Sequence, residues 1–496
     1  MKQAAANAIK PAPYPRLLMT AIRVSVVCSL WLLWSAQGVR PWQPPAFVRG
    51  PQNEQQREIA KMMHHAWKGY EEHCFGKDTY LPVSGSCDTD WNLGLTLVDS
   101  LDTLYIMGMD AEYKRARDWA VNPRMLDFSK ATYEKVFELN IRLLGGLLGA
   151  HALTGDQALL DRAVDLGDRL LPALNTGDNL PYQYVDLASG YAHGGELPIA
   201  EIGTLSLEFV SLSAASGQPR FREAVTKLGH KLRSLKKVDG LTATSLSRVN
   251  PRGDQGELSM GGGADSYYEY LLKEWLLTGQ TDSEKFEEWL SAVRGAKQHL
   301  VVKSENKSKA FITSSGDGGK MDHLSCFLPG TLALGAFFGG KETSKHMYLA
   351  KKLLRTCVKM YRGTGTFLAP ESVIVNRRSG EVKTDNGVDL LRPETVESLF
   401  YLYRLTGHKQ YQTWGWQMAQ AIERYARVEG GGYTSLESAV TGEKADSMES
   451  WFLAETLKYL FLLFDDSKTQ VPLDQYVFNT EAHPLRRLPP GYASLR

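Results

Sequence analysis

The sequence predicts an all-α fold, a toroid of seven helix hairpins with short β-hairpins. Apolar helices end in similar turns at a regular interval: Gly155, Gly217 and Gly279 follow one another every 62 residues, and Gly407 comes 128 residues later. The helix before each turn is apolar on nearly all sides, as at 141–153, whereas the helix after it is amphipathic. A long internal period of this kind is typical of repeat architectures.

The units can be followed along the whole chain. Gly108 lies one shorter unit before the series, the diglycine 339–340 fills its gap, and a last apolar helix ends near 464. Each unit pairs a buried helix with a half-exposed one, such as 157–171 or 220–232, which predicts an inner and an outer ring. An open solenoid also fits, but closure is favoured because no polar capping unit is visible. Strand signals are confined to three short segments: 180–185, 432–436 and 471–479.

Composition excludes several classes of protein. The 496 residues are 43% hydrophobic and 23% charged, an ordinary globular balance. With 57 Lys and Arg against 56 Asp and Glu, the net charge is +1, so we expect no nucleic-acid partner, because phosphate contacts need a basic surface. The five cysteines are not clustered as CxxC, which argues against a structural zinc site.

The N-terminus has the features of a targeting segment. An apolar run at 24–39 follows several basic residues and precedes a Pro-rich stretch. The run is short for a membrane span, but it lengthens to 17–39 if Arg23 reaches the interface. We therefore predict a type II membrane protein with a lumenal body; a cleaved signal peptide is the alternative. The predicted parts are a cytoplasmic tail (1–16), a signal anchor (17–39), a linker (40–52), a globular domain (53–485) and a C-terminal tail (486–496).

A lumenal location changes what the cysteines and asparagines predict. In an oxidising compartment Cys326 and Cys357 can form a disulfide, and Cys74 and Cys87 are a second candidate pair. Asn306 begins an Asn-Lys-Ser sequon in a polar segment, which predicts glycosylation in a surface loop.

Acidic residues recur near the start of the inner helices, and they meet at one mouth of the ring if these helices run the same way. A single acid there is ordinarily a helix N-terminal charge. Acids flanked by apolar residues must instead be paired, protonated or metal-bound when buried, and Arg142 and Arg392 are candidate partners. A ring of acids with few cations indicates a hard cation or acid–base catalysis. The acids are Asp99, Asp102, Glu138, Glu201, Asp265, Asp322, Glu394, Glu397, Glu449 and Glu455.

The residues also resemble a known family, glycoside hydrolase family 47, the class I α-1,2-mannosidases. The resemblance implies a closed (α/α)7 barrel with one β-hairpin plugging it. It also implies an ER or Golgi enzyme that removes α-1,2-linked mannose from high-mannose N-glycans, with inversion and with bound calcium; we expect a monomer. The matching segments are LTLVDSLDTLYIMG (95–108), VFELNIRLLGGLLGAHALTGD (136–156), AEIGTLSLEF (200–209), GGADSYYEYLLKEWLLTG (262–279), MDHLSCFLPGTLALG (321–335), LAPESV (368–373), LRPETVESLFYLYRLTG (391–407), MESWFLAETLKYLFLLF (448–464) and VFNTEAHP (477–484).

The resemblance implies a role for each matching residue. Glu138 corresponds to the acid, acting through a water, and Glu394 to the base. Asp265 is a further catalytic carboxylate and a candidate base, and Glu371 a fourth acid. Thr480 would hold calcium directly, with water-holding acids around it: Glu201, Glu397, Glu455 and Glu481. The residues that would line the sugar pocket are Arg142, His323, Arg392 and Trp451. Cys326 and Cys357 match the family disulfide.

One position departs from the family pattern. Gly263 stands where ER-type members commonly have Arg and Golgi-type members Leu, so there is room for either glycan branch and we predict broad trimming toward five mannoses.

Two other functions are alternatives to hydrolysis. A lectin-like member that recognises glycans of misfolded glycoproteins with little turnover would lack an acid or a base. A helical scaffold would not need acids on every inner helix. The presence of all four acids favours a hydrolase.

Overall fold

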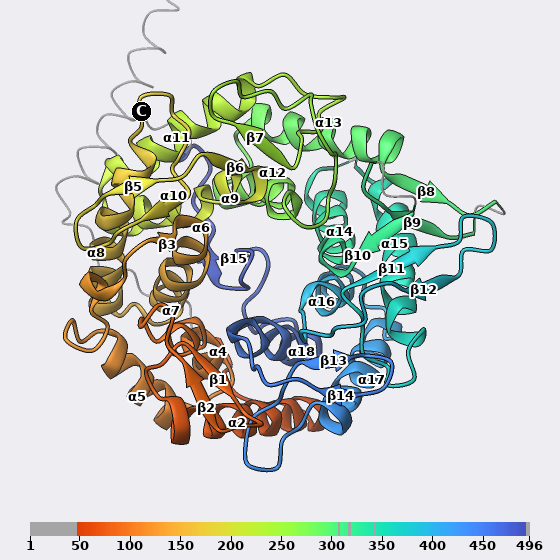
Figure 1. The fold of residues 1–496 in the computed structure, drawn as a ribbon, viewed down its shortest axis with the longest axis horizontal. Helices are drawn as coiled ribbons and strands as arrows, with labels where there is room; N and C mark the ends of the chain where they lie inside the picture. The colour runs from red at the N-terminus through yellow and green to blue at the C-terminus, as the bar shows by residue number, and fades with distance from the viewer. Residues whose placement is uncertain (1–46, 306–307, 316–318, 341–342, 493–496) are drawn as a thin grey trace, which may run out of the picture. The chain divides into compact units, whose positions relative to one another are not determined.

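The chain forms a closed ring of helices around a central axis (Figure 1). The structure is a computed structural model that describes residues 47–305, 308–315, 319–340 and 343–492. Within them, seven inner helical segments alternate with seven outer helices, which confirms the predicted (α/α)7 barrel. The predicted anchor at 17–39 and the sequon at Asn306 lie outside the described residues.

The inner ring carries the most apolar helices, and their residues are buried on nearly every side. Its segments are α3 (Leu95–Asp99) with α4 (Leu101–Ile106); α6 (Val136–Glu138), η2 (Leu139–Leu144) and α7 (Gly145–Thr154); α9 (Ile199–Gly203) with α10 (Ser206–Ser216); α12 (Asp265–Leu277); η3 (His323–Phe327) with α14 (Leu328–Phe338); α16 (Glu394–Thr406); and η4 (Phe452–Thr456) with α18 (Leu457–Leu463). The outer helices are amphipathic: α5 (Asp110–Ala120), α8 (Gln157–Leu174), α11 (Pro219–Ser234), α13 (Ser283–His299), α15 (His346–Arg362), α17 (Gln410–Tyr425) and α2 (Glu54–Cys74).

The turn glycines of the sequence repeat each let the chain reverse from an inner to an outer helix. Gly155, Gly217, Gly279 and Gly407 have φ angles of 71°, 70°, 77° and 73°, in the left-handed region that glycine adopts without a steric penalty. The predicted turns are therefore confirmed at each of these positions.

The ring is closed by the first outer helix rather than by a helix after 464. The side chain of Asn53, which caps α2, donates to the carbonyl of Phe464 at 2.7 Å, and Gln56 donates to the carbonyl of Phe461 at 2.9 Å. The last inner helix, α18, is thus covered by α2. This arrangement explains why the sequence shows no polar capping unit at either end.

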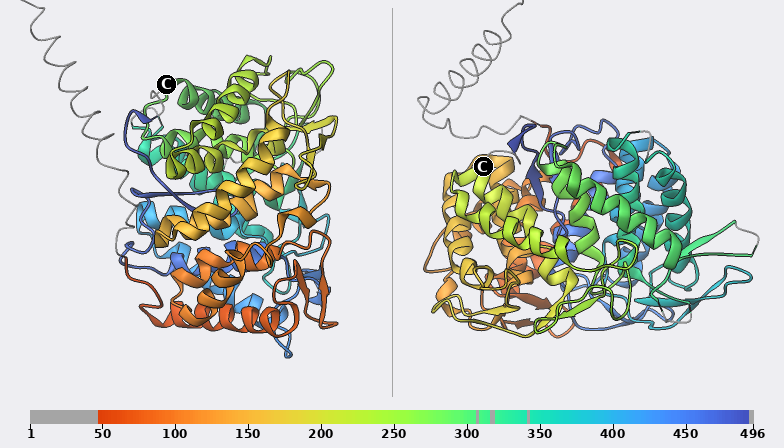
Figure 2. Two further views of the ribbon diagram at one scale, coloured as in Figure 1. Left: turned by 90° about the vertical axis from the view of Figure 1, so that its left-hand side faces the viewer. Right: turned by 90° about the horizontal axis from the view of Figure 1, so that it is seen from above.

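Short antiparallel strand pairs lie between the helices, and one of them, the hairpin of β15 (Tyr476–Phe478) and β16 (Pro484–Arg486), lies within the ring (Figure 1). Seen from above in Figure 2 (right), the dark-blue β15–β16 lies at the face opposite the yellow strands of the β3–β4–β5 sheet. Phe478 of β15 contacts the rings of Phe400 and Tyr459, so the hairpin plugs one end of the barrel as predicted. The predicted strands 180–185, 432–436 and 471–479 are shorter or shifted: β4, β13 and β15 pair over only two or three residues.

The strands are β1 (Thr79–Leu81) with β2 (Ser86–Asp88); β3 (Glu134–Lys135), β4 (Tyr184–Val185) and β5 (Ala192–His193); β6 (Glu196–Pro198) with β7 (Ser245–Ser247); β8 (Val301–Lys303) with β9 (Ala310–Ile312); β10 (Lys320–Asp322), β11 (Ser372–Val375) and β12 (Val382–Thr384); β13 (Leu436–Ser438) with β14 (Glu443–Lys444); and β15 (Tyr476–Phe478) with β16 (Pro484–Arg486).

Two disulfides join elements of the barrel, as the sequence predicted. Cys326 of η3 is bonded to Cys357 of α15, and Cys74 at the end of α2 is bonded to Cys87 of β2. Among the described residues, one helical span, Val136–Thr154, is long and apolar enough to cross a membrane, but 83% of it is buried inside the barrel. That burial is what the core position of an inner helix requires.

Candidate active site

The interior of the ring holds a pocket of about 280 Å³ that ends near β15 and has many acids in its lining. The inner helices supply them, as the recurrence of acids predicted. The lining includes eight carboxylates, namely Glu138, Glu201, Asp265, Glu269, Glu394, Glu397, Glu455 and Glu481, together with Arg142, Arg392, Trp451, Thr480 and Gly263. Of the other predicted site residues, Glu371 and His323 do not line the pocket but contact residues that do.

Glu138 is held by Arg142, one of the two arginines expected to pair with the acids. Arg142 follows it by four residues, and its Nε donates to Glu138 Oε2 at 2.7 Å. Arg142 also donates to Ser450 at 3.0 Å, and Ser450 donates to Asp99 at 2.5 Å. A π-helical turn, η2, lies at this point, and such turns often occur at functional sites. Glu138 therefore has a fixed orientation at the pocket wall.

Glu394 opens α16 and is bound to a histidine behind it. His323 Nδ1 lies 2.9 Å from Glu394 Oε2, and its Nε2 lies 2.9 Å from the hydroxyl of Tyr361. Burial raises the pKa of Glu394, but the His323 hydrogen bond and the charge of Arg392 outweigh it, so the pKa lies below its usual range. Glu394 is thus ionised at neutral pH, as a general base must be.

Asp265 has the opposite electrostatic environment. It is the first residue of α12, and its carboxylate accepts one backbone hydrogen bond, from Ser266 at 2.9 Å. Burial raises its pKa to about 7, and the charge of Glu394 adds to the effect. Two carboxyls whose pKa values are moved apart in one pocket are typical of an acid–base catalytic site.

A pair of arginines encloses the indole of Trp451. Arg392 and Arg142 lie 5.3 Å and 5.0 Å from the centre of its rings, and its Nε1 donates to the carbonyl of Leu390. The Nε of Arg392 also contacts both oxygens of Glu371, at 2.7 and 2.9 Å. Glu371 therefore orients Arg392, which pairs with an acid as expected, although this acid is only partly buried.

The inner end of the pocket has more acids than cations. Lys273 is fully buried and bonds Glu269 and, at 3.3 Å, Glu397. Arg142 approaches Glu481 only to 3.6 Å, and the buried Oε2 of Glu481 has no hydrogen-bond partner. Burial raises the pKa of Glu397 and Glu481 to about 8, and that of Glu455 well above its usual range.

This surplus of carboxylate oxygen fits a hard divalent cation such as calcium. Thr480 lines the same pocket and offers a hydroxyl and a carbonyl. Within the part of the chain that the structure describes, no three His, Cys, Asp or Glu side chains are close enough to hold an ion directly. The donors in this part of the pocket therefore suit a cation that meets the acids through water molecules. Glu201 lines the same pocket and is bonded to Lys135 at 3.1 Å and Gln183 at 2.8 Å.

A buried polar network that sequence reasoning missed holds the turn after β15. The amide of Asn479 donates to Glu208 at 2.8 Å and its oxygen accepts from the backbone of Glu481 and His483. His483 in turn contacts Asp102 and Asp99, at 2.7 and 2.9 Å. Burial lowers the pKa of His483, but these carboxylates outweigh it and raise the pKa to about 9.

Two buried lysines, Lys273 and Lys458, pair with acids in this interior. The sequence marks each of them as a charged residue within an apolar helix. Lys273 stands in an otherwise apolar helix, four residues after Glu269, and Lys458 does so in the last inner helix. A buried lysine needs a carboxylate, and Lys458 contacts Asp102 at 2.6 Å. The acids of this interior are therefore paired with lysines as well as with the expected arginines.

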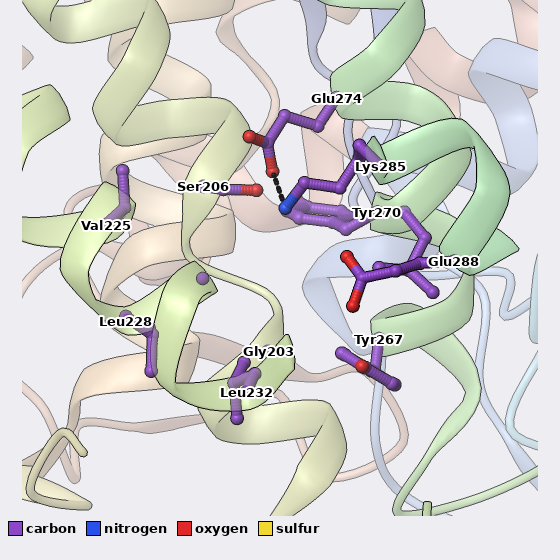
Figure 3. A pocket seen from close by; sticks show the side chains of 12 residues that line it. Gly203, Ser206, Val225, Leu228, Leu232, Tyr267, Tyr270, Glu274, Lys285 and Glu288 are labelled. Atoms are coloured by element: carbon purple, nitrogen blue, oxygen red, sulfur yellow. Dashed lines mark ion pairs between the residues drawn. The ribbon is translucent and has the colours of Figure 1, made fainter. Parts of the chain in front are cut away.

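A second, smaller cavity lies in the wall between α11, α12 and α13 (Figure 3). Its volume is about 20 Å³, which suffices for one water molecule rather than a sugar. Lys285 and Glu274, which line it, already pair at 3.0 Å. It is therefore a packing gap and not the active site.

The barrel and its pocket hold carboxyls with opposed pKa shifts, an arrangement that suits the acid and base of a glycoside hydrolase. Residues 62–487 match the model of glycosyl hydrolase family 47. The chain belongs to that family, which confirms the resemblance drawn from the motifs.

Named relatives agree with this assignment. An endoplasmic reticulum mannosyl-oligosaccharide 1,2-alpha-mannosidase of Homo sapiens is 43% identical over 467 residues, which are 90% of this chain and 66% of that protein. A mannosyl-oligosaccharide 1,2-alpha-mannosidase of Arabidopsis thaliana is 42% identical over 450 residues, 88% of this chain and 79% of the relative. The solved structure of an alpha-1,2-mannosidase from Trichoderma reesei superposes with a TM-score of 0.81 at 28% identity, covering 88% of this chain and 100% of that one.

Proposed function

We propose that this glycoside hydrolase is an inverting exo-α-1,2-mannosidase that trims high-mannose N-glycans with bound calcium. The observation that carries the proposal is the opposition between Glu394, whose pKa is lowered, and Asp265, whose pKa is raised to about 7, in one sugar-sized pocket. The naming of the relatives as α-1,2-mannosidases supports the substrate.

In the proposed mechanism, Glu394 removes a proton from the attacking water, and Glu138 protonates the departing glycosidic oxygen through a second water. Inversion follows if water attacks from the face opposite the leaving group, between two carboxyls. The pKa contrast favours Glu394 over Asp265 as the base, because Asp265 is partly protonated near neutral pH. Glu371 serves by fixing Arg392 beside the sugar.

Calcium would be held by Thr480, with Glu397, Glu455 and Glu481 bonding its waters, and Glu201 completing the set at the pocket wall. When bound, it would engage vicinal hydroxyls of the terminal mannose and favour the distorted ring of the transition state. The protein prepares this site by burying one unpaired carboxylate oxygen, Oε2 of Glu481, at the inner end of the pocket. Arg142, Arg392 and Trp451 would surround the same sugar, whereas His323, which does not line the pocket, would act through its contact with Glu394.

We further propose broad trimming, from nine mannoses through eight toward five. Gly263 lines the pocket with a φ of +83°, and a Cβ there would meet Thr244 at ordinary contact distance, so the space is open but a side chain would strain the backbone. Gly263→Arg should slow removal of mannose beyond the first by about tenfold. Mass spectrometry of a nine-mannose digest over time would show this, and unchanged stopping points in the variant would contradict it.

The surroundings of the enzyme are proposed from the sequence. A tail (1–16), an anchor (17–39) and a linker (40–52) would place the catalytic domain (53–485) and the tail 486–496 in the lumen of the ER or Golgi. The ER naming of the relatives supports the compartment. Asn306 would be glycosylated, and the enzyme would act as a monomer on glycoprotein N-glycans.

The test is digestion of a nine-mannose N-glycan by the full-length protein, with and without EDTA, followed by mass spectrometry. Stepwise loss of mannose that EDTA abolishes and calcium restores is expected. No loss from folded, calcium-supplied protein would favour the lectin-like alternative, for which glycan binding without turnover is the signature.

A further inference from the structure

An aromatic cluster lies next to the pocket, on the β3–β4–β5 sheet, and no step of the proposed mechanism uses it. His193 is its hub: its ring lies 5.4 Å from those of Tyr133 and Tyr184, and 5.6 Å from that of Tyr191. Tyr133 and Tyr191 are 56% and 59% exposed, although large aromatic side chains are ordinarily buried. We call these four residues the aromatic platform.

The platform is continuous with the pocket wall. In the sheet Tyr184 lies directly opposite both Lys135 and His193, and residues opposite one another share a face. Lys135 reaches Glu201 of the pocket lining at 3.1 Å, and Gln183, next to Tyr184, reaches the other oxygen of Glu201 at 2.8 Å. The platform and the pocket are therefore joined through Glu201.

The distance from the platform to the reacting centre is short. Tyr133 precedes Glu138 by five residues, so their Cα atoms are at most roughly 18 Å apart even in a fully extended chain. Figure 1 shows β3 leading into α6 at the inner edge of the ring and β5 further out, over α8. A chain of a few sugars that leaves the pocket on this side meets the platform.

The conformation of Tyr133 points to a selected role rather than chance exposure. Its φ is +65°, which is uncommon for a residue with a side chain and particularly for a bulky one. Backbone strain of this kind is concentrated at functional positions. Here the strain presents a phenol ring to solvent beside His193 instead of burying it.

We propose that the aromatic platform binds a mannose-containing arm of the oligosaccharide that remains outside the pocket, an inference that rests on the proposed function. The pocket, at about 280 Å³, is at the small end of ligand sites, so most of a branched glycan must lie outside it. Tyrosine and histidine rings offer flat apolar faces with polar edges, which suit the apolar face and hydroxyl rim of a hexose. The platform then favours large glycans over small ones.

The experiment compares two substrates with the full-length protein: a free nine-mannose oligosaccharide and α-1,2-linked mannobiose. The double variant Tyr133→Ala with Tyr191→Ala should lower kcat/KM for the oligosaccharide about tenfold, mainly through KM, and leave mannobiose unchanged. The double variant Tyr133→Phe with Tyr191→Phe keeps the rings and should stay within about twofold. Tyr348→Ala, at an exposed tyrosine of α15 remote in sequence, is the matched control.

The outcomes are distinguishable. Equal losses on both substrates, or no loss on either, would overturn the platform. A loss seen only with protein-linked glycan would also overturn it, since the surface would then bind polypeptide. If the wild type cleaves neither substrate, the proposed function fails, and calorimetric binding of the oligosaccharide still decides the platform by comparing the wild type with the alanine variant.

Discussion

The carboxylates of the pocket fall into two groups that differ in their partners. Glu138, Glu371 and Glu394 each face a cationic or histidine side chain at 2.7–2.9 Å. Glu397 shares Lys273 with Glu269, and Glu481 has only a long contact with Arg142. Glu371 lies just outside the pocket, in the loop before β11, and the other carboxylates come from inner helices or from the turn after β15. The first group is partly buried, and the second is buried.

This difference in partners indicates a different role for each group. A buried carboxylate with its own partner is oriented and keeps a defined charge, as catalysis requires. A buried cluster without enough cations is unfavourable by itself and becomes favourable when a cation with oxygen ligands is supplied. This contrast supports the proposal that the first group carries the acid–base chemistry and that the second group faces a cation.

The largest effect is expected from removing the charge of the best-oriented acid. Glu394→Gln keeps the shape but leaves no base beside His323, so kcat should fall about 10³- to 10⁴-fold while calcium affinity stays near wild type. Kinetics with the nine-mannose glycan and calcium titration measure both. Glu443→Gln, on an exposed strand, is the control. A loss below tenfold would place the base elsewhere, with Asp265 the next candidate.

The variant Lys273→Met tests how much stability the protein gains from the buried lysine that Glu269 and Glu397 share. The change leaves Glu269 and Glu397 without a positive partner, and breaking a buried pair typically costs about 3–5 kcal/mol of unfolding free energy. Chemical denaturation in EDTA should show this loss. Lys285→Met removes a more exposed pair with Glu274 and should cost less. Equal losses of unfolding free energy in the two variants would contradict the expectation that the interior lysine contributes more to stability than the lysine of the barrel wall.

Thr480→Ala tests the metal ligand itself. Loss of the hydroxyl should weaken calcium binding about 100-fold and remove most activity, whereas Thr480→Ser keeps the oxygen and should bind nearly as the wild type does. Isothermal calorimetry on metal-stripped protein measures the affinity. Wild-type affinity in the alanine variant would refute the assignment of Thr480.

The smallest expected effect is a dependence of folding stability on pH in the metal-free protein. Burial raises the pKa of Glu397 and Glu481 to about 8 from an ordinary value near 4.5. The folded state therefore holds protons that the unfolded state has lost, and their stabilisation is complete below about pH 4.5 and is lost as pH rises through 8.

In EDTA, Tm should consequently fall between pH 5 and 8.5, by something on the order of 5 °C, and calcium should abolish the fall. Scanning calorimetry across this range is the measurement. Glu397→Gln with Glu481→Gln should flatten the EDTA curve. A Tm that rises with pH in EDTA would contradict the surplus of acid.

Much of this architecture was predictable because it depends on local signals. Glycine turns at 155, 217, 279 and 407 are determined by backbone geometry, and the apolar and amphipathic helices by their periodicity. The acids before those turns, and Arg142 four residues after Glu138, are also visible in one dimension. The sequence showed roughly where these strands form, but it did not show their lengths, because the lengths depend on pairing with distant segments.

What the sequence by itself determined, then, is the repeat, the ring of acids and the family motifs, because each arises from neighbouring residues and residue chemistry. Only the tertiary structure decided which helix closes the ring and which acid receives a cation. The closing contact joins Asn53 to Phe464, and His483 reaches Asp99 across most of the chain. Such pairings are set by how helices pack around a common axis, and no local pattern specifies them.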